Sequence, residues 1–222
     1  MKKIYLILII FLTLVSFNRL IAEDIPTIVI SAGKTIQSID TVGSTIEVID
    51  SDAINSSSYS MIGEVINDNS TSTNFFQTGG SGGNTAIQLR GLEKRYSTVY
   101  IDGVKMMDPS SPDGSFYLDN LTKNGIERVE ILKGTQSSLY GSNAIGGTIN
   151  IFTKKGKLGN HSNFEVANAS ENTKNINYSL NGANEKFNYF LGLNKYLTDG
   201  ISTMSDNDEK DMYRNDNVVG NF

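Results

Sequence analysis

The stretch from Gly125 to Thr153 constrains the fold more than any other part of the chain, because two alternating segments flank a glycine-rich connection. Val129 and Ile131 alternate with polar residues, as do Ile149 and Ile151, which is the pattern of half-buried strands. The glycines between these strands are Gly134, Gly141, Gly146 and Gly147. Glycine suits places where the backbone turns sharply or approaches another segment closely. The stretch therefore predicts two strands joined by a tight, closely packed turn.

The N-terminus has the pattern of an export signal. Met1-Lys-Lys precedes a run from Ile4 to Phe17 that is almost free of polar residues, as in a secretory signal peptide. We expect cleavage after Ala22. The alternative, a transmembrane helix, needs about 20 apolar residues, and this run is shorter. Because the chain has no cysteine, it carries no lipid-attachment cysteine, disulfide or thiolate, which suits an exported bacterial envelope protein.

Composition and chemistry argue against two classes of function. The net charge of −5 gives no basic face for nucleic acid, so no nucleic-acid partner is expected. An enzyme is also disfavoured, because His161 is the only histidine and none of the three serines considered as nucleophiles has a candidate base nearby. Ser81, Ser138 and Ser142 are therefore interpreted as turn or capping residues.

The first two thirds of the chain mix strands with short helices. Strands are expected at Thr45–Ile49, at Thr85–Gly91 and at Ser97–Gly103, the last running into an Asp-Gly hairpin turn. Asp50 begins a segment suited to capping a short helix. A second helix is expected over Ser60–Asn67, where apolar residues recur at helical spacing.

From about Asn160 the chain changes to segments of about 10 alternating residues, as in transmembrane β-strands. The connections between these segments are short, except for a long polar run from Thr198 to Asp211. We expect the apolar side chains to face lipid and the polar ones to face a lumen. A soluble antiparallel sandwich would give the same alternation. The apolar positions are Phe164 and Val166, then Ile176, Tyr178 and Leu180, then Phe187, Tyr189, Leu191 and Leu193.

Four motifs in order resemble those of TonB-dependent outer-membrane receptors. Thr27–Ala32 is similar to the TonB box, and Ile87–Gly91 to an arginine-glycine strand of the plug domain. Val99–Val104 is similar to the plug's Asp-Gly hairpin, and Glu127–Thr153 to the end of the plug. Within the family, the stretches Gln77–Gly82 and Leu139–Gly147 resemble the vitamin B12 receptor group.

The resemblance implies an α+β plug domain, with a small mixed sheet and short helices, followed by the first antiparallel strands of a truncated transmembrane β-barrel. The expected divisions are a signal peptide at residues 1–22, a TonB box and linker at 23–36, the plug at 37–157 and barrel strands at 158–222. Twenty-two strands of about 10 residues need at least about 220 residues. Only residues 158–222 follow the plug, so Phe222 is interpreted as a truncation point.

The family further implies a ligand-gated importer of the outer membrane, powered by a TonB-like periplasmic energy transducer, with a corrinoid as the ligand. The alternatives are a ferric siderophore or other metal chelate as the ligand and a secreted binding module consisting of the plug alone. The TonB box residues are Thr27, Ile28, Val29, Ile30, Ser31 and Ala32, an apolar run expected to be exposed for pairing with the transducer.

Three further sets of residues follow from the loops and charges. The expected ligand-binding loops comprise Gln77, Thr78, Gly79, Gly80, Ser81, Gly82, Gly83 and Asn84, with Asp108, Pro109, Ser110, Ser111, Pro112, Asp113 and Gly114. Plug charges expected to pair with the barrel wall, rather than lie on a solvated face, are Arg90, Glu127, Arg128 and Glu130. Calcium ligands could come from Asp199, Asp206, Asp208, Glu209 and Asp211, which otherwise form a solvated acidic loop.

Overall fold

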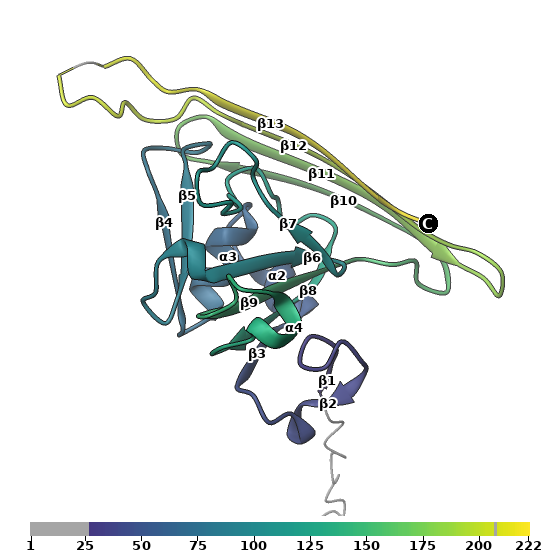
Figure 1. The fold of residues 1–222 in the computed structure, drawn as a ribbon. Helices are drawn as coiled ribbons and strands as arrows, with labels where there is room; N and C mark the ends of the chain where they lie inside the picture. The colour runs from purple at the N-terminus through teal and green to yellow at the C-terminus, as the bar shows by residue number, and fades with distance from the viewer. Residues whose placement is uncertain (1–26, 207) are drawn as a thin grey trace, which may run out of the picture.

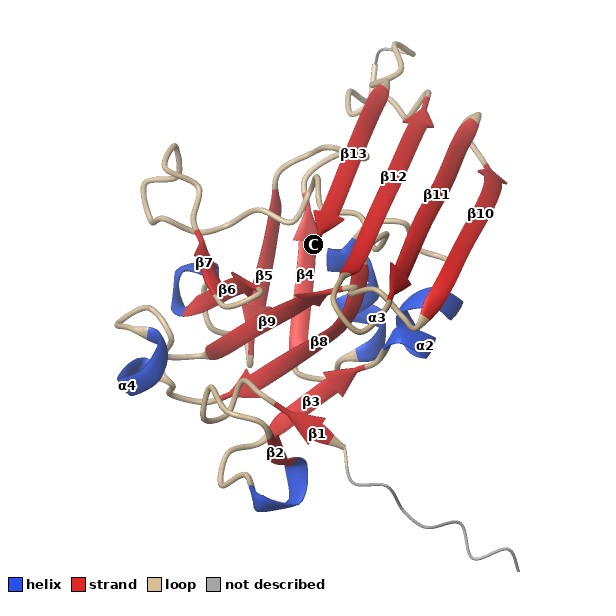
Figure 2. Ribbon diagram, turned by 90° about the vertical axis from the view of Figure 1, so that its right-hand side faces the viewer, coloured by secondary structure: helices blue, strands red, loops and turns tan. Residues whose placement is uncertain are grey.

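A plug built around a five-stranded sheet lies against one face of a separate four-stranded sheet (Figure 1). Figure 2 shows the four strands side by side, with two helices of the plug below their lower ends. The computed structural model describes residues 27–206 and 208–222. The expected signal peptide, residues 1–22, lies outside the described residues. The plug and the four strands correspond to the mixed domain and the first barrel strands expected from the sequence.

The central sheet of the plug has the order β3-β8-β9-β6-β7. Its strands are β3 (Ile46–Ile49), β6 (Ser97–Ile101), β7 (Val104–Met106), β8 (Ile126–Lys133) and β9 (Gly147–Thr153). Strand β9 is antiparallel to β8 and parallel to β6. Asp102 and Gly103 both have positive φ, 47° and 82°, as a tight two-residue hairpin turn requires, so the expected hairpin between β6 and β7 is confirmed.

The glycine-rich connection between β8 and β9 packs as the sequence predicted. Gly134 and Gly141 have φ of 89° and 88°, a region that favours glycine. At Gly147, a Cβ atom would lie 2.1 Å from the carbonyl oxygen of Leu132, so only glycine allows the two strands to approach. The connection also contains the short helix α4 (Ser137–Tyr140).

Two helices, α2 (Ser51–Ser56) and α3 (Ile62–Asn69), pack against the central sheet. Asp50 caps α2 as expected, since its carboxylate accepts a hydrogen bond of 2.9 Å from Ala53 N. Helix α3 begins two residues later than predicted, because Ile62 N donates to Leu121 O and so ties the helix start to a distant loop. Short 3-10 helices, η1 and η2, cover Ile39–Thr41 and Lys94–Tyr96. Within the described ranges, no helix is long and apolar enough to cross a membrane.

Both faces of the central sheet are covered, which differs from the half-buried pattern expected. Val129 and Ile131 are fully buried against the helices, but Glu130, on the other face of β8, is also 0% exposed. The second face is covered by α4 and by the N-terminal segment that carries β1 (Ile28–Val29) and β2 (Gln37–Ser38). Because that segment is about 100 positions away in the sequence, alternation within β8 could not reveal it.

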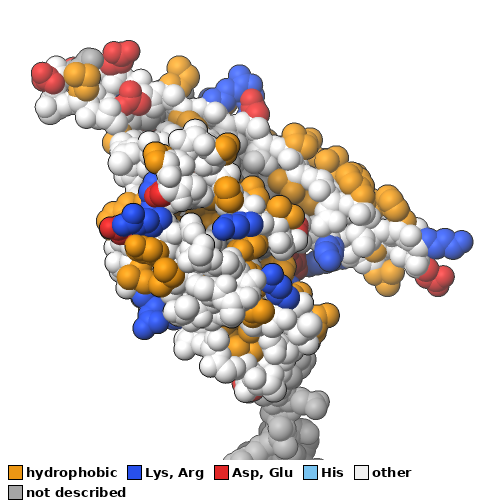
Figure 3. Space-filling view, in the orientation of Figure 1, with side chains coloured by type: hydrophobic (Ala, Val, Ile, Leu, Met, Phe, Trp, Pro, Cys, Tyr) orange, Lys and Arg blue, Asp and Glu red, His pale blue; other side chains and the backbone are white. Residues whose placement is uncertain are grey.

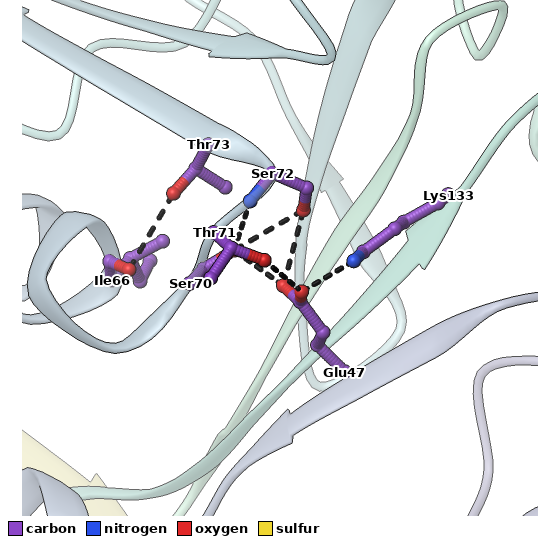
Figure 4. Close-up of polar contacts among 7 residues, drawn as sticks. All are labelled: Glu47, Ile66, Ser70, Thr71, Ser72, Thr73 and Lys133. Carbon is purple, nitrogen blue, oxygen red and sulfur yellow. Dashed lines mark hydrogen bonds and ion pairs between the residues drawn. The ribbon is translucent and has the colours of Figure 1, made fainter.

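A separate hairpin, β4 (Thr73–Gln77) and β5 (Thr85–Leu89), carries the glycine loop at its tip. The chain entering β4 is anchored to the sheet by Glu47 on β3 (Figure 4). The Glu47 carboxylate accepts hydrogen bonds from Thr71 at 3.2 Å and Ser72 at 3.1 Å, and it also binds Ser70 and Lys133. One partly buried carboxylate thereby joins three segments at the base of the hairpin.

The four-stranded sheet is an antiparallel meander of β10 (Gly159–Ala169), β11 (Thr173–Ala183), β12 (Asn188–Thr198) and β13 (Tyr213–Asn221). We call it the wall. Its outer face exposes apolar side chains, among them Phe164, Val166 and Val218. Hydrophobic side chains form an orange band along the upper right of Figure 3. Asn175, Asn177, Asn194 and Asn215 are buried on the inner face, toward the plug. The alternation expected from the sequence is confirmed.

Candidate functional site

A cavity of about 530 Å³ opens at the end of the plug from which the two expected ligand loops project. It is lined by Asn84, Met107, Asp108, Pro109, Ser110, Phe116, Tyr117, Asp119, Asn120 and Leu121. We call it the apex cavity. Its lining combines two carboxylates with two aromatic rings and two amides, and it includes no lysine, arginine or histidine.

The loop beside the apex cavity is braced by its own side chains. Asp108 accepts hydrogen bonds from the backbone and hydroxyl of Ser110, at 2.8 and 2.7 Å. Asp113 accepts from the Ser111 hydroxyl at 2.6 Å and from Ser115 N at 3.0 Å. These bonds, of which the one from Ser111 contributes most, lower the pKa of Asp113 to about 2. Asp113 therefore stays ionised at neutral pH, and its hydrogen bonds stabilise this conformation of the loop.

The pKa values of two ionisable groups beside these loops are shifted in opposite directions. Burial raises the pKa of Asp119 above its usual value. Hydrogen bonds with Ser111 and Lys94 lower the pKa of Tyr117, whose hydroxyl lies 3.1 Å from Lys94 Nζ. Lys94 also lies 3.9 Å from Asp113. This lysine does not itself line the cavity and contacts the lining through Tyr117.

The glycine loop meets the wall more than it meets the apex cavity. A Cβ atom at Gly79 would lie 2.9 Å from Thr203, and one at Gly82 only 2.2 Å from the Tyr213 ring. The Ser81 hydroxyl lies 3.4 Å from that of Tyr196. The glycines thus allow the tip of the hairpin to pass beneath the wall and its long loop.

The structure brings only part of the two expected loops into one cavity. Asn84 comes from the first loop, and Asp108, Pro109 and Ser110 come from the second. Gln77, Gly80 and Ser81 instead line a separate hollow of about 440 Å³ against the wall. Sequence reasoning missed the lining residues Met107, Phe116, Tyr117, Asp119, Asn120 and Leu121. The adjacent aromatic residues that follow the polar loop were the available signal.

The expected TonB box is held by the plug. Glu130 Oε2 accepts hydrogen bonds from Ile30 N at 3.0 Å, Ser31 N at 2.8 Å and the Ser31 hydroxyl at 2.6 Å. The Tyr140 hydroxyl donates to Ser31 O. Val29 is 0% exposed and pairs with Gln37 of β2. The expected exposure is therefore found only at Thr27 and Ile28, because from Val29 to Ala32 the segment covers the second face of the sheet.

The four plug charges have different surroundings. Arg128 Nε lies 2.8 Å from Glu130 Oε1, and its guanidinium stacks 4.2 Å from the centre of the Phe152 ring. Arg90 is exposed near Gly134. Glu127 lines a polar hollow of about 490 Å³ between plug and wall, together with Lys123 and Lys154. Burial lowers the pKa of both lysines.

Neutral polar side chains, several of them amides, make the hydrogen bonds between the plug and the wall strands. Asn124 Nδ2 donates to Leu193 O at 3.1 Å, Asn175 Nδ2 to the Ser60 hydroxyl at 3.0 Å and Asn215 Nδ2 to Asn120 O at 3.1 Å. Between the described residues of the plug and strands β10–β13, no ion pair is formed. Within this part of the wall, Arg128 and Glu130 pair with each other and not with barrel charges.

The acidic residues of the long loop lie between β12 and β13. Asp211 accepts hydrogen bonds from Thr203, and the Asn172 amide lies 3.5 Å from Asp199. Across residues 27–206 and 208–222, no three acidic or histidine side chains come together as a metal site. The calcium site stays a prediction.

The sequence matches a family model and curated relatives. The model of the TonB-dependent receptor plug domain matches residues 38–148. The rhizobactin receptor of Rhizobium meliloti is 36% identical over 136 residues, which are 59% of this chain and 17% of that protein. The vitamin B12 transporter BtuB of Photobacterium profundum is 41% identical over 76 residues, which are 34% of this chain and 12% of that protein.

Solved structures share the fold. The ferripyoverdine receptor of the Pseudomonas aeruginosa outer membrane superimposes with a TM-score of 0.66 at 15% identity, covering 79% of this chain and 23% of that one. The ferric yersiniabactin uptake receptor FyuA from Yersinia pestis gives a TM-score of 0.58 at 20% identity, covering 77% of this chain and 27% of that one.

These matches and the plug-and-wall architecture define the class: the chain belongs to the TonB-dependent receptors. It contains their plug domain and antiparallel strands resembling the start of their barrel. The named relatives are receptors and transporters. The chain spans 17% or less of the length of these curated relatives.

Proposed function

We propose that this protein is a ligand-gated importer of the Gram-negative outer membrane that takes up a corrinoid, with energy supplied by a TonB-like periplasmic partner. The observation that supports this ligand class is the apex cavity. Asp108 and Asp119 line it, and no basic side chain does. A cleft lined by charge of one sign repels ligands of the same sign.

The lining suits a large ligand with little negative charge. Met107, Phe116 and Tyr117 offer apolar and aromatic surface, and carboxylates accept strong hydrogen bonds from amide groups. A corrinoid presents an apolar ring system bordered by amides. A ferric tris-catecholate carries several negative charges and would meet two carboxylates with no lysine or arginine among the lining residues; Lys94 reaches the lining only through Tyr117.

The second candidate ligand is a ferric siderophore. It is favoured by the relative named rhizobactin receptor, which matches a longer stretch of this chain than the BtuB of Photobacterium profundum does. In that case, residues outside the apex cavity would have to supply the positive charge.

Calorimetry separates the two ligands. We expect the receptor, expressed from its own gene and purified from outer membranes, to bind cyanocobalamin, and Asp108→Asn or Asp119→Asn to weaken binding several-fold. Asp40→Asn serves as the matched control, because Asp40 is an exposed acid on η1 that does not line the apex cavity. This variant should bind like the wild type. Binding only to a ferric siderophore would favour the second candidate, and binding to neither would reject both.

The TonB partnership rests on residues Thr27–Ala32. This run is rich in β-branched residues, and strand addition draws affinity from main-chain hydrogen bonds while tolerating varied side chains. We expect the partner to add a strand to it. Because the segment is held by the plug in this structure, the partner would need a state in which it has been released.

A further inference from the structure

We propose that Glu130 is a latch for the N-terminal segment: its carboxylate occupies the backbone donors of Ile30 and Ser31 that a partner strand would need. The inference rests on the proposed TonB partnership and adds its regulation. Glu130 is the buried side chain whose hydrogen bonds hold the segment against the plug.

The latch is built around one side chain. Glu130 is 0% exposed and accepts hydrogen bonds from both backbone N–H groups and from the Ser31 hydroxyl. Ser31 is itself 1% exposed. The Tyr140 hydroxyl donates to the carbonyl of Ser31, so hydrogen bonds hold both the backbone N–H and the backbone carbonyl of Ser31.

The aromatic support behind the latch is also fixed. The Tyr140 and Tyr100 rings meet edge to face with centroids 4.9 Å apart, and the Tyr100 hydroxyl donates to Tyr140 O at 2.8 Å. Burial raises the pKa of Tyr140 to about 12, so its hydroxyl keeps its proton at neutral pH. The donor to Ser31 therefore does not change with ordinary pH.

The latch takes up main-chain donors of the segment that a partner strand would use. Each N–H group has one proton to donate, and strand addition is recognised through such groups. Ile28 and Val29 are paired with Ser38 and Gln37 of β2. The next two donors point at Glu130. A partner strand and the latch are therefore alternatives.

The chemistry of Glu130 makes the latch reversible. A buried carboxylate is costly unless it is paired and hydrogen-bonded. Arg128 supplies the charge partner at 2.8 Å, whereas the segment supplies the three other donors, the backbone N–H groups of Ile30 and Ser31 and the Ser31 hydroxyl. Release of the segment would leave the Arg128 pair in place and expose the other carboxylate oxygen to water, so neither state leaves a bare buried charge.

Because the chain has no cysteine, Thr27→Cys gives a unique attachment point for a nitroxide at the exposed start of the segment. We expect the nitroxide to be immobile in the otherwise wild-type receptor and mobile after Glu130→Gln. Glutamine replaces one carboxylate oxygen by an NH2 group, which cannot accept hydrogen bonds from the backbone N–H and hydroxyl of Ser31. Ser31→Ala removes a donor without altering the core of the plug and should also increase mobility. Glu47→Gln, an acid on the same sheet with other partners, is the matched control and should leave the label immobile.

A second measurement separates the latch from the partnership. In the absence of nutrient, the affinity of Glu130→Gln for the periplasmic domain of the partner should rise about tenfold or more, because a larger fraction of the receptor is competent to bind. An immobile label in both Glu130→Gln and Ser31→Ala would overturn the latch. A mobile label without binding of the partner would support the latch and overturn the proposed partnership.

Discussion

Glu47 is a single residue on which the position of the glycine-loop hairpin depends. Burial raises its pKa, but hydrogen bonds from Lys133, Ser70 and Ser72 together outweigh burial, so the net pKa lies below the usual 4.5. The ionised form of Glu47 is therefore more stable in the folded plug than in the unfolded chain. Its contribution to stability is present above pH 4.5 and is lost as the pH falls through the lower folded-state pKa.

Replacing Glu47 with glutamine tests this contribution. Glu47→Gln should lower the free energy of unfolding at pH 7 by roughly 1–2 kcal/mol, because bonds to a charged acceptor are lost while solvent screens part of their strength. The difference from wild type should shrink as the pH falls below 4.5. Thermal unfolding followed by circular dichroism between neutral and acid pH measures both effects. A difference that is constant with pH would show that the carboxylate charge is not responsible.

At the scale of elements, the short segment of β1 would pair with a partner strand through its backbone N–H groups. Val29→Pro removes one such donor and is expected to abolish uptake while leaving nutrient binding intact, since a proline cannot donate to an added strand. Ile36→Pro, at an exposed residue outside the strands, is the matched control and should transport normally. Uptake and equilibrium binding are measured on the same cells. Normal uptake by Val29→Pro would reject the assignment of residues 27–32.

The elements that were predictable from the sequence are those whose signals are local. Asp50 caps α2, the Asp102-Gly103 turn closes a hairpin and the wall strands alternate as expected. The start of α3 was displaced because its first backbone donor binds Leu121, and the burial of Glu130 was missed because its partners are about 100 residues away. Contacts between distant segments leave no periodic pattern in either one.

The candidate site was predictable only in part, for the same reason. Asn84 and Asp108 were expected to contact ligand, and both line the apex cavity. Most of the glycine loop instead passes beneath Thr203 and Tyr213, residues of the wall and its loop. A glycine-rich sequence indicates close approach or a turn, but it does not say whether the neighbour is a ligand or the protein itself.

At the scale of the whole molecule, the wall separates two environments. Phe164, near the middle of β10, is 67% exposed on the outer face, and Asn163 lines the polar hollow beside the plug. If the outer face meets lipid, Phe164→Arg should reduce stability in the membrane by roughly 2–4 kcal/mol, and Asn163→Arg by much less. Folding into lipid vesicles over a urea series measures the difference. Equal effects of the two substitutions would contradict a lipid-facing outer surface.

Uptake tests the central claim most directly, because import requires the ligand, the membrane and the partner together. Radiolabelled cyanocobalamin is supplied to Gram-negative cells that lack their own corrinoid receptor and express this protein, with or without the TonB-like partner. Accumulation should exceed that of cells without the protein only when the partner is present. Accumulation that is absent in both strains, or unchanged by loss of the partner, would contradict TonB-dependent corrinoid import.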